Sequence, residues 1–432
     1  MKYRPSRGLV LCMIPLLATA TAGAWAWSRA KDVPPRERGK GDFLAIVKKK
    51  RDPSGEDRVD TPAARKALRE GSAAMKEKML REYPGLRIEE KPVPDEDNAF
   101  LQLHKLAGFA TESRPLVGEN LQQFLSGNAE WDRAKVQAAL AEEAELVAIA
   151  EKIGAMAERS SSNMPEDYNG FVDARTAKYL GDILMLKARI AAEDQDPQEA
   201  LRLVGATRNL SEHFREIEQP SLLAETVSIL LDSSAMDAAF DKLLPALGPG
   251  VDLAPWKEAM LPRDYSPAGF THVMRGEWNT TAEFYLYPAI LRQKPADGEE
   301  LARQHAANFE TLIQKLPGMS WSEFAEEGFK PLAEGISNFS GKSGEIAKGF
   351  LNDSQPWCKG YTRSVSVFSL YEAALDLMIL EQGGETLAAE SVKTLKPDPV
   401  SGKSYRFDPA TRTLSAPEEM EALNVQPVKL PW

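Results

Sequence analysis

The sequence feature that most constrains the fold is a run of two or three successive amphipathic helices between Phe171 and Leu231. The acidic turn 193–196 separates the first two and leads into Pro197, which suits the first turn of the following helix. The apolar stripe of the first segment comprises Tyr179, Leu180, Ile183, Leu184 and Ile190, and that of the second comprises Leu201, Val204, Leu210, Phe214 and Ile217. Neither helix can bury its stripe alone, so further helices must pack against this hairpin.

The rest of the chain also has the apolar periodicity of helices. Helices are predicted at 61–83, from 95–98 through Leu106, at 131–159, 220–244, 277–291, 298–316, 321–336 and 361–381. Segment 250–276 is predicted to be irregular because it contains Pro255, Pro262 and Pro267, and Gly341, Gly344 and Gly349 are interpreted as turns. Two short extended runs on either side of the turn 408–411 predict a β-hairpin.

The predicted fold class is therefore all-α, with an irregular, solenoid-like body of helical hairpins, a small C-terminal β-hairpin and an N-terminal signal or anchor helix. The expected domains are a signal peptide or membrane anchor (1–30), a flexible basic linker (31–61), an N-terminal helical domain (62–250), a C-terminal helical region (251–395), and the hairpin with a tail (396–432).

Charge is distributed unevenly along the chain. Residues 1–51 contain twelve Lys and Arg against three acidic residues, a net charge of +9. Since the whole chain carries −11, the remainder carries −20. An acidic body repels phosphate backbones, so we expect no nucleic-acid partner.

The first thirty residues have the layout of an export signal: a basic start, an apolar run and a stretch of small residues. The apolar region is also long enough to remain as a membrane anchor, so both a cleaved and a retained segment are open. The residues expected to form the anchor are Leu9, Val10, Leu11, Ile14, Leu16, Leu17, Trp25 and Trp27. We favour an exported protein anchored in the inner membrane and facing the periplasm or extracytoplasmic space.

The segment after this apolar run gives a competing topology. It is more basic than the leader and includes the cluster Lys48–Arg51, which the positive-inside rule would place in the cytoplasm. A cytoplasmic-facing adaptor bound to anionic lipids therefore remains an alternative.

The unit 171–217 resembles a single tetratricopeptide-like hairpin. A short acidic turn precedes a helix that opens with the alanine–leucine pair Ala200–Leu201. The tryptophan and glycine marks of the first helix in that family are absent, and no second copy occurs at a fixed spacing. The resemblance implies a protein-binding helical hairpin.

The chain end 361–415 resembles the ending of type II secretion pseudopilins and of uncharacterised exported or membrane-anchored bacterial helical proteins that share it. The shared features are a helix with Leu370–Tyr371, then Gly383–Gly384, then Asp398–Pro399 followed by Gly402 and Tyr405. In a pseudopilin the anchoring helix comes immediately before such a module, whereas here some three hundred residues intervene. We interpret it as a docking or capping hairpin.

No catalytic, cofactor or metal signature is found in the sequence. The two cysteines, Cys12 and Cys358, cannot form a cysteine-based zinc site, and the four histidines are scattered. Glu277, between Gly276 and Trp278 at an expected helix start, is the best candidate for a buried functional acid, although a first-turn acid that stabilises the helix dipole explains it equally well.

The sequence therefore favours a membrane-tethered helical scaffold or binding module of the cell envelope with a protein or peptide partner. An extracytoplasmic hydrolase, whose acidic residues converge only in the fold, is the main alternative. The oligomeric state stays open.

Overall fold

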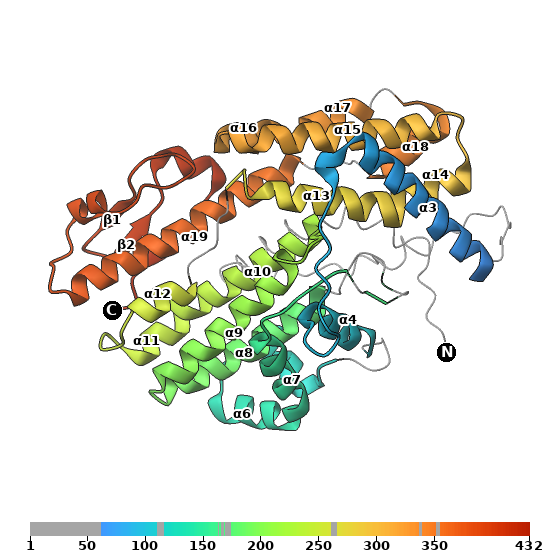
Figure 1. The fold of residues 1–432 in the computed structure, drawn as a ribbon. Helices are drawn as coiled ribbons and strands as arrows, with labels where there is room; N and C mark the ends of the chain where they lie inside the picture. Colours follow the sequence, from blue (N-terminus) through green and yellow to red (C-terminus); the bar gives the residue numbers. More distant parts are fainter. Residues whose placement is uncertain are drawn as a thin grey trace, which may run out of the picture. The chain divides into compact units, whose positions relative to one another are not determined.

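The computed structural model describes residues 62–109, 116–162, 164–165, 168, 174–260, 266–336, 339–350 and 355–432 (Figure 1). This part of the chain is predominantly helical and ends in a small antiparallel sheet. The predicted signal or anchor (1–30) and the linker (31–61) lie outside the described residues. Within the described part, the helices are either too short or too polar to cross a membrane.

The chain forms two compact units, and each is discontinuous in sequence. Unit 1 contains the described residues up to Arg87 together with Trp278–Lys315 and Ala325–Gly360. Unit 2 contains Ile88–Glu277, Leu316–Phe324 and Tyr361–Trp432.

Unit 1 contains two main packing contacts, one made by its first helix and one made by α15. Its elements are α3 (Pro62–Glu82), η1 (Pro84–Leu86), η3 (Ala282–Leu286), α14 (Tyr287–Gln293), α15 (Gly298–Lys315), α17 (Lys330–Ile336) and α18 (Gly341–Phe350). Helix α3 packs against η3 and α14, and α15 packs against α17. Gly71 of α3 lies against the Leu291 side chain, and Lys76 forms an ion pair with Glu283 at 2.6 Å.

Unit 2 is organised around three consecutive helices, α8 (Ala174–Glu193), α9 (Pro197–Arg215) and α10 (Leu222–Ala238), which lie side by side in Figure 1. Its remaining elements include α4 (Ala99–Phe109), α5 (Glu119–Leu125), α6 (Arg133–Glu142), α7 (Ala144–Ala155), η2 (Ala239–Leu243), α11 (Leu244–Leu247), α12 (Ala254–Met260) and η4 (Leu316–Gly318). Three further helices have residues in both units: α13 (Phe270–Thr281), α16 (Trp321–Glu327) and α19 (Gln355–Gln382).

The predicted central hairpin is confirmed. Leu180, Ile183 and Leu184 are fully buried, and so are Val204 and Leu210. The Asp196 carboxylate accepts a hydrogen bond from the backbone N–H of Glu199 at 3.0 Å, and Pro197 is the first residue of α9. This cap and the fixed φ of proline explain why the second helix begins where the sequence indicates.

The predicted C-terminal hairpin is also confirmed, with a third strand added. Strands β1 (Arg406–Asp408), β2 (Thr413–Ser415) and β3 (Val428–Lys429) pair antiparallel in that order, and η5 (Ala389–Thr394) and η6 (Glu418–Leu423) flank them. Phe407, Leu414 and Val428 lie opposite one another and are buried.

Two helices predicted as continuous are each broken in two. The predicted helix 131–159 is divided between α6 and α7 at Glu143, whose φ and ψ are −107° and 28°. The Glu143 carboxylate accepts the backbone N–H of Gly118 at 2.8 Å, a contact that periodicity alone cannot reveal. The predicted helix 321–336 is likewise divided between α16 and α17.

Two segments predicted as irregular contain helices, and residues 261–265 of the first, with Pro262, lie outside the described part of the chain. Helices α12 and most of α13 lie within 250–276, where Pro255 is in the first turn of α12 and Pro267 precedes α13. Both prolines stand where a helix tolerates them, so they do not interrupt the structure. The glycines interpreted as turns, Gly341, Gly344 and Gly349, belong to α18.

Prolines inside helices produce a different local structure. Segments η2 and η3 are π-helical, and each is followed two residues later by a proline, Pro245 and Pro288. Proline has no N–H to donate and crowds the preceding turn, so a local widening of the helix accommodates it.

Candidate functional site

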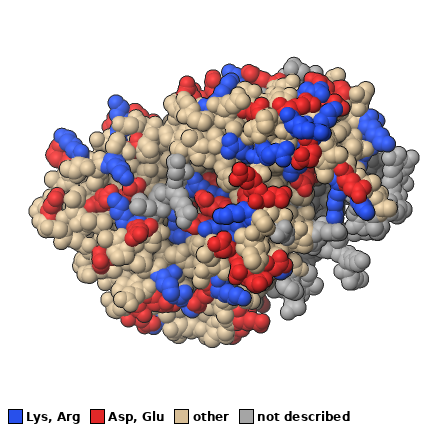
Figure 2. All heavy atoms as spheres, in the orientation of Figure 1, with Lys and Arg blue, Asp and Glu red and all other residues tan. Residues whose placement is uncertain are grey.

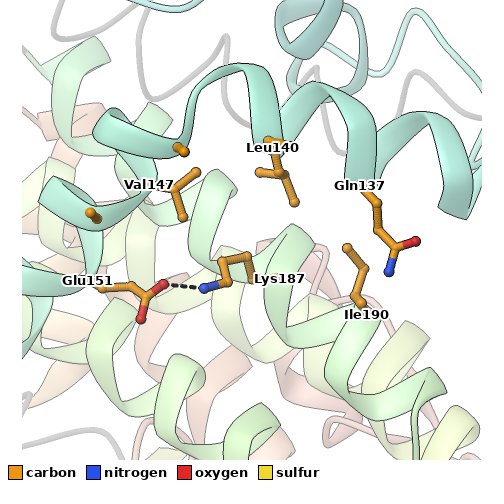
Figure 3. A pocket seen from close by; sticks show the side chains of 9 residues that line it. Gln137, Leu140, Val147, Glu151, Lys187 and Ile190 are labelled. Atoms are coloured by element: carbon orange, nitrogen blue, oxygen red, sulfur yellow. Dashed lines mark hydrogen bonds and ion pairs between the residues drawn. The ribbon is translucent and has the colours of Figure 1, made fainter.

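The candidate site is an open groove in unit 2 between α6 and α7 on one side and α8 on the other (Figure 3). It has a volume of about 430 Å³, which lies within the range of binding sites for small ligands or short peptide segments. Its lining residues are Gln137, Leu140, Ala141, Ala144, Val147, Ala148, Glu151, Lys187 and Ile190.

Short side chains create the groove. Ala141 of α6 and Ala144 and Ala148 of α7 are solvent-exposed and all line the groove, so they form a low stripe along these two helices. Leu140 and Val147 are buried beneath this stripe, and Ile190 of α8 forms the opposite wall. Because methyl groups stand where longer chains would fill the space, the groove is apolar and open.

A charged network closes one end of the groove. The Glu151 carboxylate of α7 forms an ion pair with Lys187 of α8 (Figure 3) and accepts a hydrogen bond from Arg202 of α9 at 2.7 Å. Partial burial raises the pKa of Glu151, but the hydrogen bonds and charges of the two cations outweigh burial and lower it. Glu151 is therefore ionised and joins three helices at this end.

Two further contacts secure the packing of α6 against α8 beyond the groove. The Arg189 guanidinium of α8 lies over the Trp131 ring, 3.7 Å from its centroid. Arg133 at the start of α6 forms an ion pair with Asp194 in the turn after α8. These contacts hold the walls in place while leaving the apolar floor uncovered.

The groove has the composition of a binding surface. Six of its nine lining residues are apolar, and its acid and its lysine are paired with each other. Such a lining can bury apolar side chains and orient a partner by the polar end. Figure 2 shows that Lys and Arg are interleaved with Asp and Glu on the face that it draws.

The predicted functional acid, Glu277, has a structural role. It lies within α13, eight residues into a helix that begins at Phe270, so the prediction that it stands at a helix start is wrong. Its carboxylate accepts the backbone N–H of Leu222 at 2.7 Å and so caps the first turn of α10.

Two neighbouring contacts dock α13 on the turn that joins α9 to α10. The His272 ring bonds the Ile217 carbonyl through Nε2 at 2.8 Å, and Gly276 faces Pro220 so closely that a Cβ would overlap the proline backbone. The H-x-x-x-G-E spacing of α13 is therefore a packing motif.

The histidines of the described chain occupy separate environments. His104 packs edge-on against Tyr168, and His213 bonds the Ile153 carbonyl at 2.9 Å. His305 is buried against Phe309 with neither ring nitrogen hydrogen-bonded. Among the described residues, no group of three or more His, Cys, Asp or Glu side chains is placed to hold a metal ion.

No family model matches the chain, and no curated protein or solved structure is significantly similar to it.

The groove was not among the sites predicted from the sequence. The available signal was the alanine spacing at 141, 144 and 148 on a helix otherwise rich in exposed charge. The same spacing is typical of a helix face that is packed against a neighbour. The groove can therefore be recognised only once the position of α8 is known.

Proposed function

We propose that this protein is a helical protein-binding module of the cell envelope and that the groove between α6, α7 and α8 receives its partner. The observation that carries the proposal is an apolar floor, open to solvent, between fixed helical walls. Hairpins of helices commonly present such surfaces to peptides, which is also the role implied by the tetratricopeptide-like features of 171–217.

The shape of the groove favours an amphipathic helix as the occupant. Its lining comes from the second half of α6, from Gln137 to Ala141, and from α7, from Ala144 to Glu151, which correspond to about one and about two helical turns. The exposed alanine stripe allows a partner backbone to approach closely, and the apolar residues of the partner would fill the space above Leu140 and Val147. The polar end at Glu151 and Lys187 would fix the register of the partner.

Site-specific photo-crosslinking tests this proposal. A photoreactive phenylalanine analogue at Ala144, inside the groove, is expected to capture one protein partner in cells, with the adduct mapping to an amphipathic segment. The matched control is Ala138, which is also exposed on α6 but does not line the groove. Equal adducts at both positions, or adducts at 138 alone, would contradict the assignment.

We further propose that the N-terminal segment tethers this module to the membrane with the helical body outside the cytoplasm. The support is the sequence of residues 1–30, with its basic start, apolar run and tryptophans at the end of that run. Protease added to intact spheroplasts is expected to digest a tag at the C-terminus, and carbonate washing is expected to leave the protein in the membrane fraction. A tag protected until the cells are lysed would instead favour the cytoplasmic-facing topology.

A further inference from the structure

A ladder of polar side chains is buried between the antiparallel helices α9 and α10. Its three rungs join Arg208 to Asp232 at 2.7 Å, Ser211 to Ser228 at 2.7 Å, and Arg215 to Glu225 at 3.6 Å. On each helix the three positions are three and then four residues apart, so they form one face. The ladder replaces part of the apolar contact expected between these helices.

The Glu225 rung differs from the other two. Glu225 is 0% exposed, and neither of its carboxylate oxygens has a hydrogen-bond partner. The nearest cationic atom is Nε of Arg215, at 3.6 Å. A buried carboxylate without hydrogen bonds is costly when ionised and far less costly when protonated.

The charged groups around Glu225 come from each helix of this cluster. Arg215 at the end of α9 favours its ionised form, whereas Glu216 beside it and Asp232 on α10 disfavour it. From α13, His272 interacts with Arg215 and Glu216, and Glu277 caps the same turn of α10.

Burial is the largest influence on Glu225. Together with the neighbouring acids, and against the charge of Arg215, burial raises the pKa of Glu225 from its ordinary 4.5 to about 7.

We propose that this end of the ladder is a proton-controlled latch, in which α9 and α10 close over the neutral Glu225 side chain and open at their shared turn when it ionises. Opening admits water to the carboxylate and releases the end of α9 and the start of α10. Since α13 docks on the same turn through His272, Gly276 and Glu277, opening also loosens that contact.

The direction of the pH dependence follows from proton binding by Glu225 in the closed state and in the open state. The closed state binds the proton more tightly than the open state, so the closed state is favoured below pH 4.5 and loses that advantage as pH rises towards 7. The full change in the opening equilibrium is about 300-fold, and between pH 5 and pH 8 it is about 70-fold. Above pH 7 the opening reaches a plateau.

Hydrogen–deuterium exchange of the full chain tests the latch locally. After correction for the intrinsic dependence of exchange on pH, peptides covering 211–230 are expected to open about 70-fold more readily at pH 8 than at pH 5. The Glu225→Gln variant, a neutral isostere, is expected to change by less than about threefold over the same range. Glu199→Gln, which removes an acid at the far end of α9, is expected to behave as the wild type.

Two outcomes would overturn the proposal. One is an equal pH dependence in the wild type and Glu225→Gln; the other is a pH-dependent change spread evenly over all described helices. A second measurement needs no variant: infrared difference spectra of the wild type are expected to show a protonated carboxyl band that disappears with a midpoint near pH 7. Complete loss of that band by pH 6 would count against the latch even if Glu225→Gln failed to fold.

Discussion

Replacing Asp232 by alanine is expected to lower the free energy of unfolding by about 3 to 5 kcal/mol, because it removes the carboxylate that is ion-paired with the buried guanidinium of Arg208. The two side chains are 7% and 3% exposed, so water cannot compensate for the lost partner. Urea denaturation followed by circular dichroism at pH 7 measures the change, with the midpoint and slope fitted separately.

Two further variants test whether burial causes this loss of stability. The double variant Arg208→Met with Asp232→Leu removes both charges and is expected to recover most of the lost stability. Glu70→Ala breaks the exposed pair with Lys66, whose side chains are 67% and 78% exposed, and is expected to change stability by less than about 0.5 kcal/mol. A loss below about 1 kcal/mol for Asp232→Ala would show that the ladder is hydrated.

Acidification from pH 7 to pH 4 is expected to destabilise the protein through its buried histidines. Burial lowers the pKa of His305 from 6.5 to about 3 and that of His213 from 6.5 to about 4. Both rings are neutral in the folded state. Their contribution to the free energy of unfolding is therefore fully present above pH 6.5 and is lost as pH falls towards the lowered pKa values. Each histidine accounts for up to about 3 kcal/mol at pH 4.

The His305→Leu variant separates the two histidines. It removes a ring whose two nitrogens lack hydrogen bonds, so it is expected to stabilise the protein at pH 7 by about 1 to 2 kcal/mol. It should also remove about half of the acid-induced loss. Thermal melts of both proteins from pH 4 to pH 8 provide the comparison, and parallel pH profiles would indicate that His305 is hydrated in the folded state.

The central hairpin could be predicted because its information is local. Apolar spacing, the Asp196 cap and Pro197 all act within a few residues, and together they define α8 and α9. The break at Glu143 could not be predicted, since it depends on a hydrogen bond to Gly118 from a distant segment. The two compact units are each assembled from segments that alternate along the chain.

The candidate site was hidden for a related reason. A groove is the space that side chains leave empty. Ala144 and Ala148 line this groove only because Lys187 and Ile190 of α8 form its opposite wall. Glu277 was selected from the sequence for its position between glycine and tryptophan, yet it acts as a cap on a helix about fifty residues earlier. The heptad spacing of the ladder is visible in the sequence, but its charge pairing requires the antiparallel packing of α9 on α10.

We propose that the groove beside α8 holds a partner helix. The most direct test of this proposal is the dissociation constant of a synthetic peptide comprising the segment that crosslinks at position 144, measured by fluorescence anisotropy. Ala144→Trp fills the groove and is expected to weaken binding at least about tenfold, a loss of about 1.4 kcal/mol, whereas Ala138→Trp should leave it unchanged. Equal affinities of the wild type and Ala144→Trp would contradict the claim.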